Sequence, residues 1–131
     1  MKKTTVLLVF LFIFSFSLHA YEITPPAWIQ GRWQMNEDAE KVFVFFKNDM
    51  YIVVSVREYL KEEFIADFTQ EITDTSYSIY FERNDGEWER MVFSLSATEE
   101  NVLTLLYCAS TAENGAEKFS FTRISDEPVA P

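Results

Sequence analysis

Histidine is almost absent from this 131-residue chain, whose single histidine is His19, close to the start. A folded domain without imidazole has no His-based nucleophilic triad, no histidine general base and no ordinary His/Cys zinc site. Cysteine is equally scarce, because Cys108 is the only one and a single thiol forms no internal disulfide. The fold must therefore be held together by its core, and we expect neither a metal nor a cofactor.

Basic residues are also few, with 11 Lys and Arg against 21 Asp and Glu. Two of them, Lys2 and Lys3, precede an apolar run from Val6 to Phe16, and the next residues end in the small Ala20. This three-part layout is typical of a secretory signal peptide. The run is too short for a spanning helix, which needs roughly 20 residues. We expect cleavage after Ala20, a periplasmic or secreted protein, and no stable membrane insertion afterwards.

The chain that remains after cleavage, residues 21–131, is strongly acidic. It keeps nine basic and all 21 acidic residues, which gives a formal net charge of −12. Such a surface repels nucleic acid and anionic lipid headgroups, so neither is an expected partner. Its length suits one domain with an independent core.

Glycine is rare, with only three residues, whereas Phe, Tyr, Val and Ile are abundant. Short apolar runs separated by turn residues are typical of many strands with short connections. The strongest hairpin signal is Asn84-Asp85-Gly86, because Asp-Gly tolerates the positive φ of tight turns. The expected strands cover residues 29–36, 41–46, 50–56, 76–83, 87–95, 102–108 and 117–124.

The segment from Arg57 to Phe68 is ambiguous. Its apolar residues lie near helical spacing among Lys and Glu, which predicts a short helix near residues 57–66. The same residues also fit a loop that leads into a strand over residues 65–72. We favour some helix, and both interpretations stay open at this point.

Short connections between neighbouring strands predict an all-β fold, an antiparallel up-and-down β-barrel of about eight strands. Closure removes exposed edge strands, which matters in a chain of high β-propensity. A β-sandwich is the main competitor. We divide the chain into a signal peptide (1–20), an N-terminal lead-in (21–28), the barrel (29–125) and a disordered tail (126–131).

Apolar and polar residues alternate in the later strands, which indicates one buried face. The first hairpin, residues 41–56, is instead apolar on both faces, so the pattern does not decide which face of residues 41–46 points inward. Its outer side needs a cover. The segment 59–68 is the obvious one, and another subunit is the alternative. The residues expected to point inward are Tyr77, Ile79, Phe81, Met91, Phe93, Leu95, Leu103, Leu105, Tyr107, Phe119 and Phe121.

The stretch AWIQGRWQM carries a Gly-x-Trp, Gly31 and Trp33, on the first expected strand. It resembles the first-strand motif of the calycin barrels, which include lipocalins and fatty-acid-binding proteins. In those families the Trp closes one end of the barrel and a basic side chain from the last strand packs on it. Arg123 matches that basic residue. The chain is most similar to small exported bacterial lipocalin-like domains, although it is shorter than typical lipocalins and lacks their disulfide and C-terminal helix.

The resemblance implies a lipocalin-like protein that binds a small apolar ligand inside its barrel. We expect no enzymatic activity, because the acidic pairs fit solvated surface and no histidine activates Cys108. The alternative is a filled-barrel interaction module of the bacterial envelope, or a self-associating structural domain, with another envelope protein or itself as partner. Gly31, Trp33 and Arg123 are expected to close the barrel. The candidate ligand-binding residues are Trp33, Phe43, Phe45, Tyr77, Ile79, Phe81, Met91, Phe93, Leu105 and Tyr107.

Overall fold

The computed structural model describes residues 21–52, 54–61, 63–112 and 115–129, so the expected signal peptide and the last two residues of the expected tail lie outside the described residues. Eight strands form one antiparallel sheet in the order β3-β2-β1-β8-β7-β6-β5-β4. The predicted all-β, up-and-down fold is confirmed. The elements are β1 (Gly31–Met35), β2 (Val42–Phe45), β3 (Met50–Tyr51), α2 (Val56–Tyr59), β4 (Ile65–Ile72), β5 (Ser76–Arg83), β6 (Trp88–Leu95), β7 (Val102–Ala109) and β8 (Glu117–Ser125).

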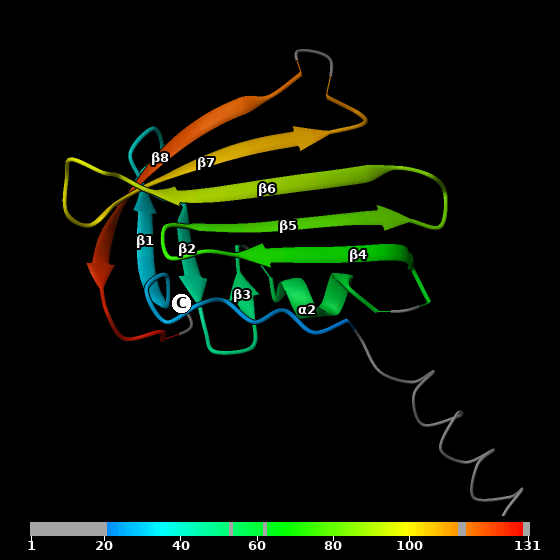
Figure 1. The fold of residues 1–131 in the computed structure, drawn as a ribbon, viewed down its shortest axis with the longest axis horizontal. Coiled ribbons are helices and arrows are strands. Elements are labelled where there is room, and N and C mark those ends of the chain that lie inside the picture. The colour runs from blue at the N-terminus through cyan, green and yellow to red at the C-terminus, as the bar shows by residue number, and fades with distance from the viewer. Residues whose placement is uncertain (1–20, 53, 62, 113–114, 130–131) are drawn as a thin grey trace, which may run out of the picture.

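The sheet curls into a half-barrel. The last strand, β8, returns to pair with the first, β1, and every other ladder joins neighbours in the chain. Figure 1 shows the consequence, with β1, β2 and β3 standing across the long strands β4 to β7. Within the described residues no ladder joins β3 to β4, so these two strands are the edges of the sheet.

The strands β5 to β8 lie within a residue or so of the predicted ranges, and their burial alternates as expected. Tyr77 and Ile79 are fully buried, as are Phe93 and Phe121 on the strands that follow. The Asp85-Gly86 turn joins β5 to β6, and Gly86 has a φ of +92°. Alternation predicts these strands well because each has one face on the core and one toward solvent.

The strand expected over residues 50–56 is wrong in length, because β3 ends at Tyr51. The Asp49 carboxylate folds the chain back. It accepts hydrogen bonds from the backbone N–H of Met50 at 2.7 Å, the Ser55 hydroxyl at 2.5 Å and the backbone N–H of Arg57 at 3.1 Å. An apolar run therefore leaves the sheet, because one carboxylate satisfies donors on both sides of the bend.

Both interpretations of residues 57–68 hold in part. A short helix is present as α2, but it ends at Tyr59, and β4 then begins at Ile65 as the alternative predicted. The expectation that this segment covers the outer side of the first hairpin is wrong. Val56 and Leu60 are buried in the same core cluster as Phe43, on the inner side of the sheet.

The outer side of the first hairpin is covered from within the sheet. Val44 lies on the face opposite Phe43 and Phe45 and is nevertheless fully buried. Its cross-strand partners are Arg32 on β1 and Tyr51 on β3. Partners in register lie side by side on one face, so these two long side chains flank Val44 from both directions.

The lead-in belongs to the core rather than preceding it. Ile23 is fully buried, as is Ile29 just after the lead-in, and the ring of Tyr21 packs on Phe68 of β4 with 5.5 Å between centroids. Gln70 of β4 hydrogen-bonds the backbone of the same segment at Glu22 and Thr24. In Figure 1 this segment passes beside β3 and α2, so it contributes apolar side chains where the sheet is open.

Candidate functional site

One end of the half-barrel is sealed around Trp33. This indole is fully buried, and its Nε1–H donates to the carbonyl of Ile29 at 2.8 Å. Arg123, its register partner on β8, places its guanidinium carbon 4.3 Å from the centroid of the indole ring. The contact that the resemblance of this stretch implies is therefore present, with the geometry of a cation–π pair.

Arg123 also ties the lead-in to the last strand. Its two terminal nitrogens donate to the carbonyls of Gln30 at 2.7 Å and Trp28 at 2.6 Å. Gly31 leaves the space for this arrangement, since a Cβ built on it would lie 2.4 Å from the Ser125 carbonyl oxygen. These residues join the first and last strands of the sheet and present no open surface to a ligand.

The Trp33–Arg123 pair makes a quantitative prediction. Arg123→Ala should destabilise the protein, and should cost about 0.5–2 kcal/mol less in the Trp33→Ala background, because the cation–π term is already gone. Denaturant unfolding of the two single variants and the double variant measures this coupling. The same cycle with Trp88→Ala, on the outer face, is the control and should be additive. Additive losses for Trp33 as well would show that the pair contributes no energy of its own.

The other end of the half-barrel encloses a cavity of about 470 Å³. That volume lies in the range of small-molecule sites, roughly 300–1,000 Å³. Its floor is apolar and its rim carries charged groups from the ends of β5 to β8. The lining residues are Met35, Lys41, Phe43, Ile52, Val54, Val56, Tyr59, Phe81, Arg83, Glu89, Met91, Leu105, Tyr107, Glu117 and Phe119.

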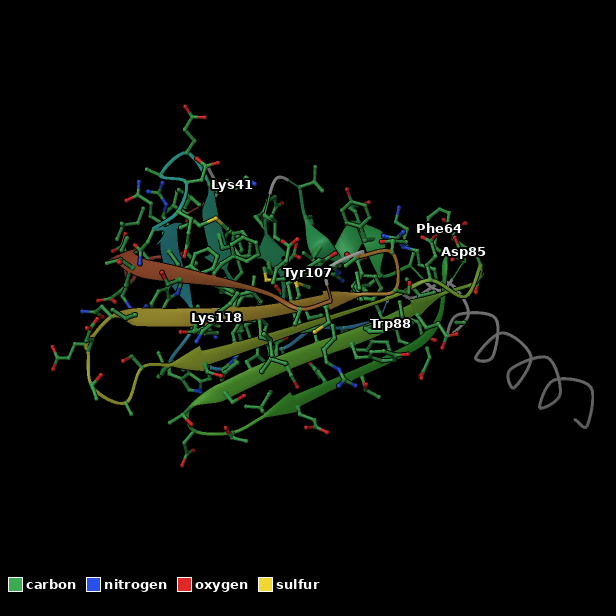
Figure 2. The ribbon with its side chains drawn as sticks, turned by 90° about the horizontal axis from the view of Figure 1, so that it is seen from above. Lys41, Phe64, Asp85, Trp88, Tyr107 and Lys118 are labelled. Atoms are coloured by element: carbon green, nitrogen blue, oxygen red, sulfur yellow. The ribbon has the colours of Figure 1, made fainter. Side chains whose placement is uncertain are left out.

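A polar network occupies one wall of this cavity. The Tyr107 hydroxyl donates to one oxygen of Glu89 at 2.5 Å, and an Arg83 Nη donates to the other at 2.9 Å. The second Nη of Arg83 donates to Glu87 at 3.3 Å. Desolvation, with the Glu89 hydrogen bond and charge, raises the pKa of Tyr107 to about 12, so the phenol keeps its proton. In Figure 2, Tyr107 lies between Lys41 and Asp85.

The structure divides the ten sequence-derived candidates into two groups. Five of them line the cavity, namely Phe43, Phe81, Met91, Leu105 and Tyr107. The other five, Trp33, Phe45, Tyr77, Ile79 and Phe93, are fully buried in the packed core, where ring contacts such as Phe45–Phe93 at 5.0 Å hold them. The residues of both groups point inward. They differ in their position along the strands, because one group lies at the open end of the half-barrel and the other in the packed core.

Sequence reasoning missed the charged wall, although a signal for it existed. Only apolar and aromatic residues were expected to point inward, yet Glu89 shares strand parity with Met91 and lines the cavity. Arg83 shares parity with Phe81 in the same way, and Glu117 with Phe119. Parity beyond the last apolar residue of each strand would have found all three. No comparable signal marks Ile52 and Val54, because the Asp49 bend brings them there.

Other chemistry finds little support in the part of the chain that the structure describes. Those residues contain no group of three or more His, Cys, Asp or Glu placed to hold a metal ion. Their helices include none long and apolar enough to cross a membrane. Cys108 is half-buried, and its register partner is Arg90, whose side chain packs over Tyr80 on the outer face.

The contrast between the two ends of the half-barrel identifies the candidate site. The Trp33 end is filled, whereas the end rimmed by Arg83, Glu89 and Glu117 leaves space above an apolar floor. A search with protein-family models, with curated protein sequences and with solved structures found no match to this chain.

Proposed function

We propose that this protein is an exported, non-enzymatic carrier that binds a small, largely apolar molecule in the open end of its half-barrel. The observation that carries the proposal is the 470 Å³ cavity, which lies directly above a fully packed core. Protein interiors are usually close-packed, as the core at the Trp33 end is. A cavity of this size at the other end is therefore a feature that a bound ligand would explain.

The walls of the cavity suit an apolar ligand. Phe43, Phe81, Met91 and Leu105 form an apolar surface that is nearly inaccessible to water in bulk, each of them at most 6% exposed. A ligand that enters the cavity gains roughly 25 cal/mol for each Å² of apolar surface, mainly its own, that is removed from water. The expected lipocalin-like character, supported by the Trp33–Arg123 closure, agrees with binding inside the sheet rather than on it.

The segment that follows β3 provides the entrance. Val54 and Tyr59 border the cavity and are 43% and 55% exposed, so apolar side chains reach the solvent at its mouth. The hydrogen bond from Ser55 to Asp49 holds the segment after β3 against the sheet. Its apolar residues therefore border the cavity mouth on the side where β3 and β4 do not pair.

Titration with a neutral apolar fluorophore, N-phenyl-1-naphthylamine, tests the proposal. We expect saturable binding at one site for each chain, seen as enhanced emission. Phe119→Ala, on the cavity wall, should weaken it about tenfold, because an aromatic side chain contributes roughly 1.5–3 kcal/mol on burial. The matched control is Phe68→Ala, which removes a half-buried phenylalanine that packs on Tyr21 instead.

Two results would overturn the carrier proposal. One is the lack of saturable binding by delipidated wild-type protein. The other is equal weakening by Phe119→Ala and Phe68→Ala, which would indicate a general loss of packing rather than a lost contact. The filled-barrel interaction module would then be the better hypothesis.

A further inference from the structure

The charged groups at the cavity mouth differ in how far they are already neutralised. Arg83 is paired with two carboxylates, Glu87 and Glu89. Glu117 lies opposite Tyr107 in the β7–β8 ladder and has no ion pair within the described part of the chain. The wall built by β5 to β8 therefore holds a net negative charge with an uncompensated carboxylate at its rim.

The turns that border the lining add to this negative potential. The β1–β2 turn leads into Lys41, and the β5–β6 turn joins Arg83 to Glu89. These two turns carry the acidic residues Glu37, Asp38, Glu40, Asp85 and Glu87. Lys41 is the only basic residue in them, and residues 21–131 as a whole have a formal net charge of −12. The lining itself balances Lys41 and Arg83 against Glu89 and Glu117, so the excess negative charge at the mouth comes from these turns. An excess of one sign of charge concentrates ligands of the opposite sign.

Aromatic side chains line the same cavity as Glu89 and Glu117. Tyr59, Tyr107 and Phe119 all line the cavity, and Tyr59 is more than half exposed. The face of an aromatic ring attracts an ammonium group by its quadrupole, and aromatic rings with carboxylates are the usual means of holding organic cations. A carboxylate headgroup gains nothing from these faces and is repelled by Glu117.

We propose that the ligand is a cationic amphiphile, an apolar tail with an amine or quaternary ammonium head. The tail lies on the floor of Phe43, Phe81 and Met91, and the head lies at the rim near Glu117. This inference rests on the proposed function, because it specifies the ligand class of the same cavity. Lys41 is exposed at the mouth and disfavours the head locally, but the acidic residues around it outnumber it.

The test compares three ligands with the same tail and different heads: decyltrimethylammonium, decanol and decanoate. Each is titrated below its micelle-forming concentration at pH 7.5 and low ionic strength, as a competitor of bound N-phenyl-1-naphthylamine. Displacement of the fluorophore restricts the measurement to the cavity. We expect decyltrimethylammonium to bind about tenfold more tightly than decanoate, with decanol between them. Added salt should reduce this ratio, because it screens exposed charges.

A charge-neutralising variant locates the preference. Glu117→Gln should reduce the cation-to-anion ratio about fivefold, because it removes the carboxylate next to the ligand head. The matched control, Glu71→Gln on the edge strand β4, removes one exposed carboxylate from residues that do not line the cavity and should leave the ratio almost unchanged. Circular dichroism of both variants shows that the fold is kept.

The outcomes separate the inference from the proposed function. Decanol binding together with decanoate equal to or tighter than decyltrimethylammonium would overturn the cationic ligand and leave the carrier proposal standing. Failure of all three compounds to displace the bound fluorophore would overturn the cationic ligand, whereas failure of the fluorophore itself to bind would overturn both. Equal effects of Glu117→Gln and Glu71→Gln would also contradict the inference, because the preference would then come from net charge and not from the cavity rim.

Discussion

Replacing Trp33 with alanine should lower the free energy of unfolding by about 3–5 kcal/mol, the usual cost of removing a large aromatic side chain from a core. Trp33 is fully buried, its indole N–H donates to the Ile29 carbonyl, and the Arg123 guanidinium packs over its ring. The variant loses the apolar burial and leaves a buried acceptor without its donor. Thermal unfolding followed by circular dichroism should show a melting temperature at least about 10 °C lower.

A second tryptophan provides the comparison. Trp88 is half-buried on the outer face, where its ring lies 6.1 Å from that of Tyr80. Trp88→Ala should cost about 1 kcal/mol or less, because solvent already reaches this side chain. Similar losses at Trp33 and Trp88 would contradict the role of Trp33 in closing the half-barrel.

Gly31→Ala should be the most damaging single-methyl change in the described chain, with an expected loss of about 2–4 kcal/mol in unfolding free energy. Two costs combine at this position. The φ of +127° is one that residues with a Cβ rarely adopt. The added Cβ would also lie 2.4 Å from the Ser125 carbonyl oxygen and 2.9 Å from an Arg123 nitrogen. Relief of that clash requires β8 to move away from β1.

Gly86 separates the two costs. Its φ of +92° is also unfavourable for alanine, but a Cβ there meets no atom within 4 Å. Gly86→Ala should therefore cost only about 1 kcal/mol, the conformational part alone. Denaturant unfolding of both variants checks the difference. A loss at Gly31 no larger than that at Gly86 would show that the β1–β8 contact yields easily, contrary to the packing around Arg123.

Much of the fold follows from local pattern. In β5 to β8 the alternation of apolar and polar residues predicted both the strand ranges and the inward faces. It did so because each strand has one face packed on the core and one face toward solvent. The pairing of Trp33 with Arg123 was also expected, but from the resemblance of the Gly-x-Trp stretch to a first-strand motif and not from alternation. In the first hairpin, alternation could not show which face points inward, because Val42 to Phe46 is apolar throughout.

Two features of the candidate site lie outside the apolar pattern of the strands. The position of Ile52 and Val54 follows from the Asp49 carboxylate, which binds Ser55 and Arg57 across a bend. The charged wall follows from the ends of strands, where Glu89 keeps inward parity after the apolar residues have ended. The apolar pattern marks neither feature, because an inward position is apolar only where the sheet is covered. Strand parity continued past the apolar residues does mark the charged wall, whereas it does not mark Ile52 and Val54.

The sequence by itself determined that this chain makes an antiparallel up-and-down sheet, which residues of its later strands face inward, and that Gly31, Trp33 and Arg123 meet. Only the tertiary structure decided that Phe43 and Phe45 are the inner face of β2 and that Ile52, Val54, Val56 and Leu60 lie against the inner side. It also decided that the half-barrel is filled at one end and hollow at the other. The physical reason is that alternation along one strand shows only which of its two faces is buried. The curl of the sheet decides which strands face each other across the interior, and that depends on every ladder together.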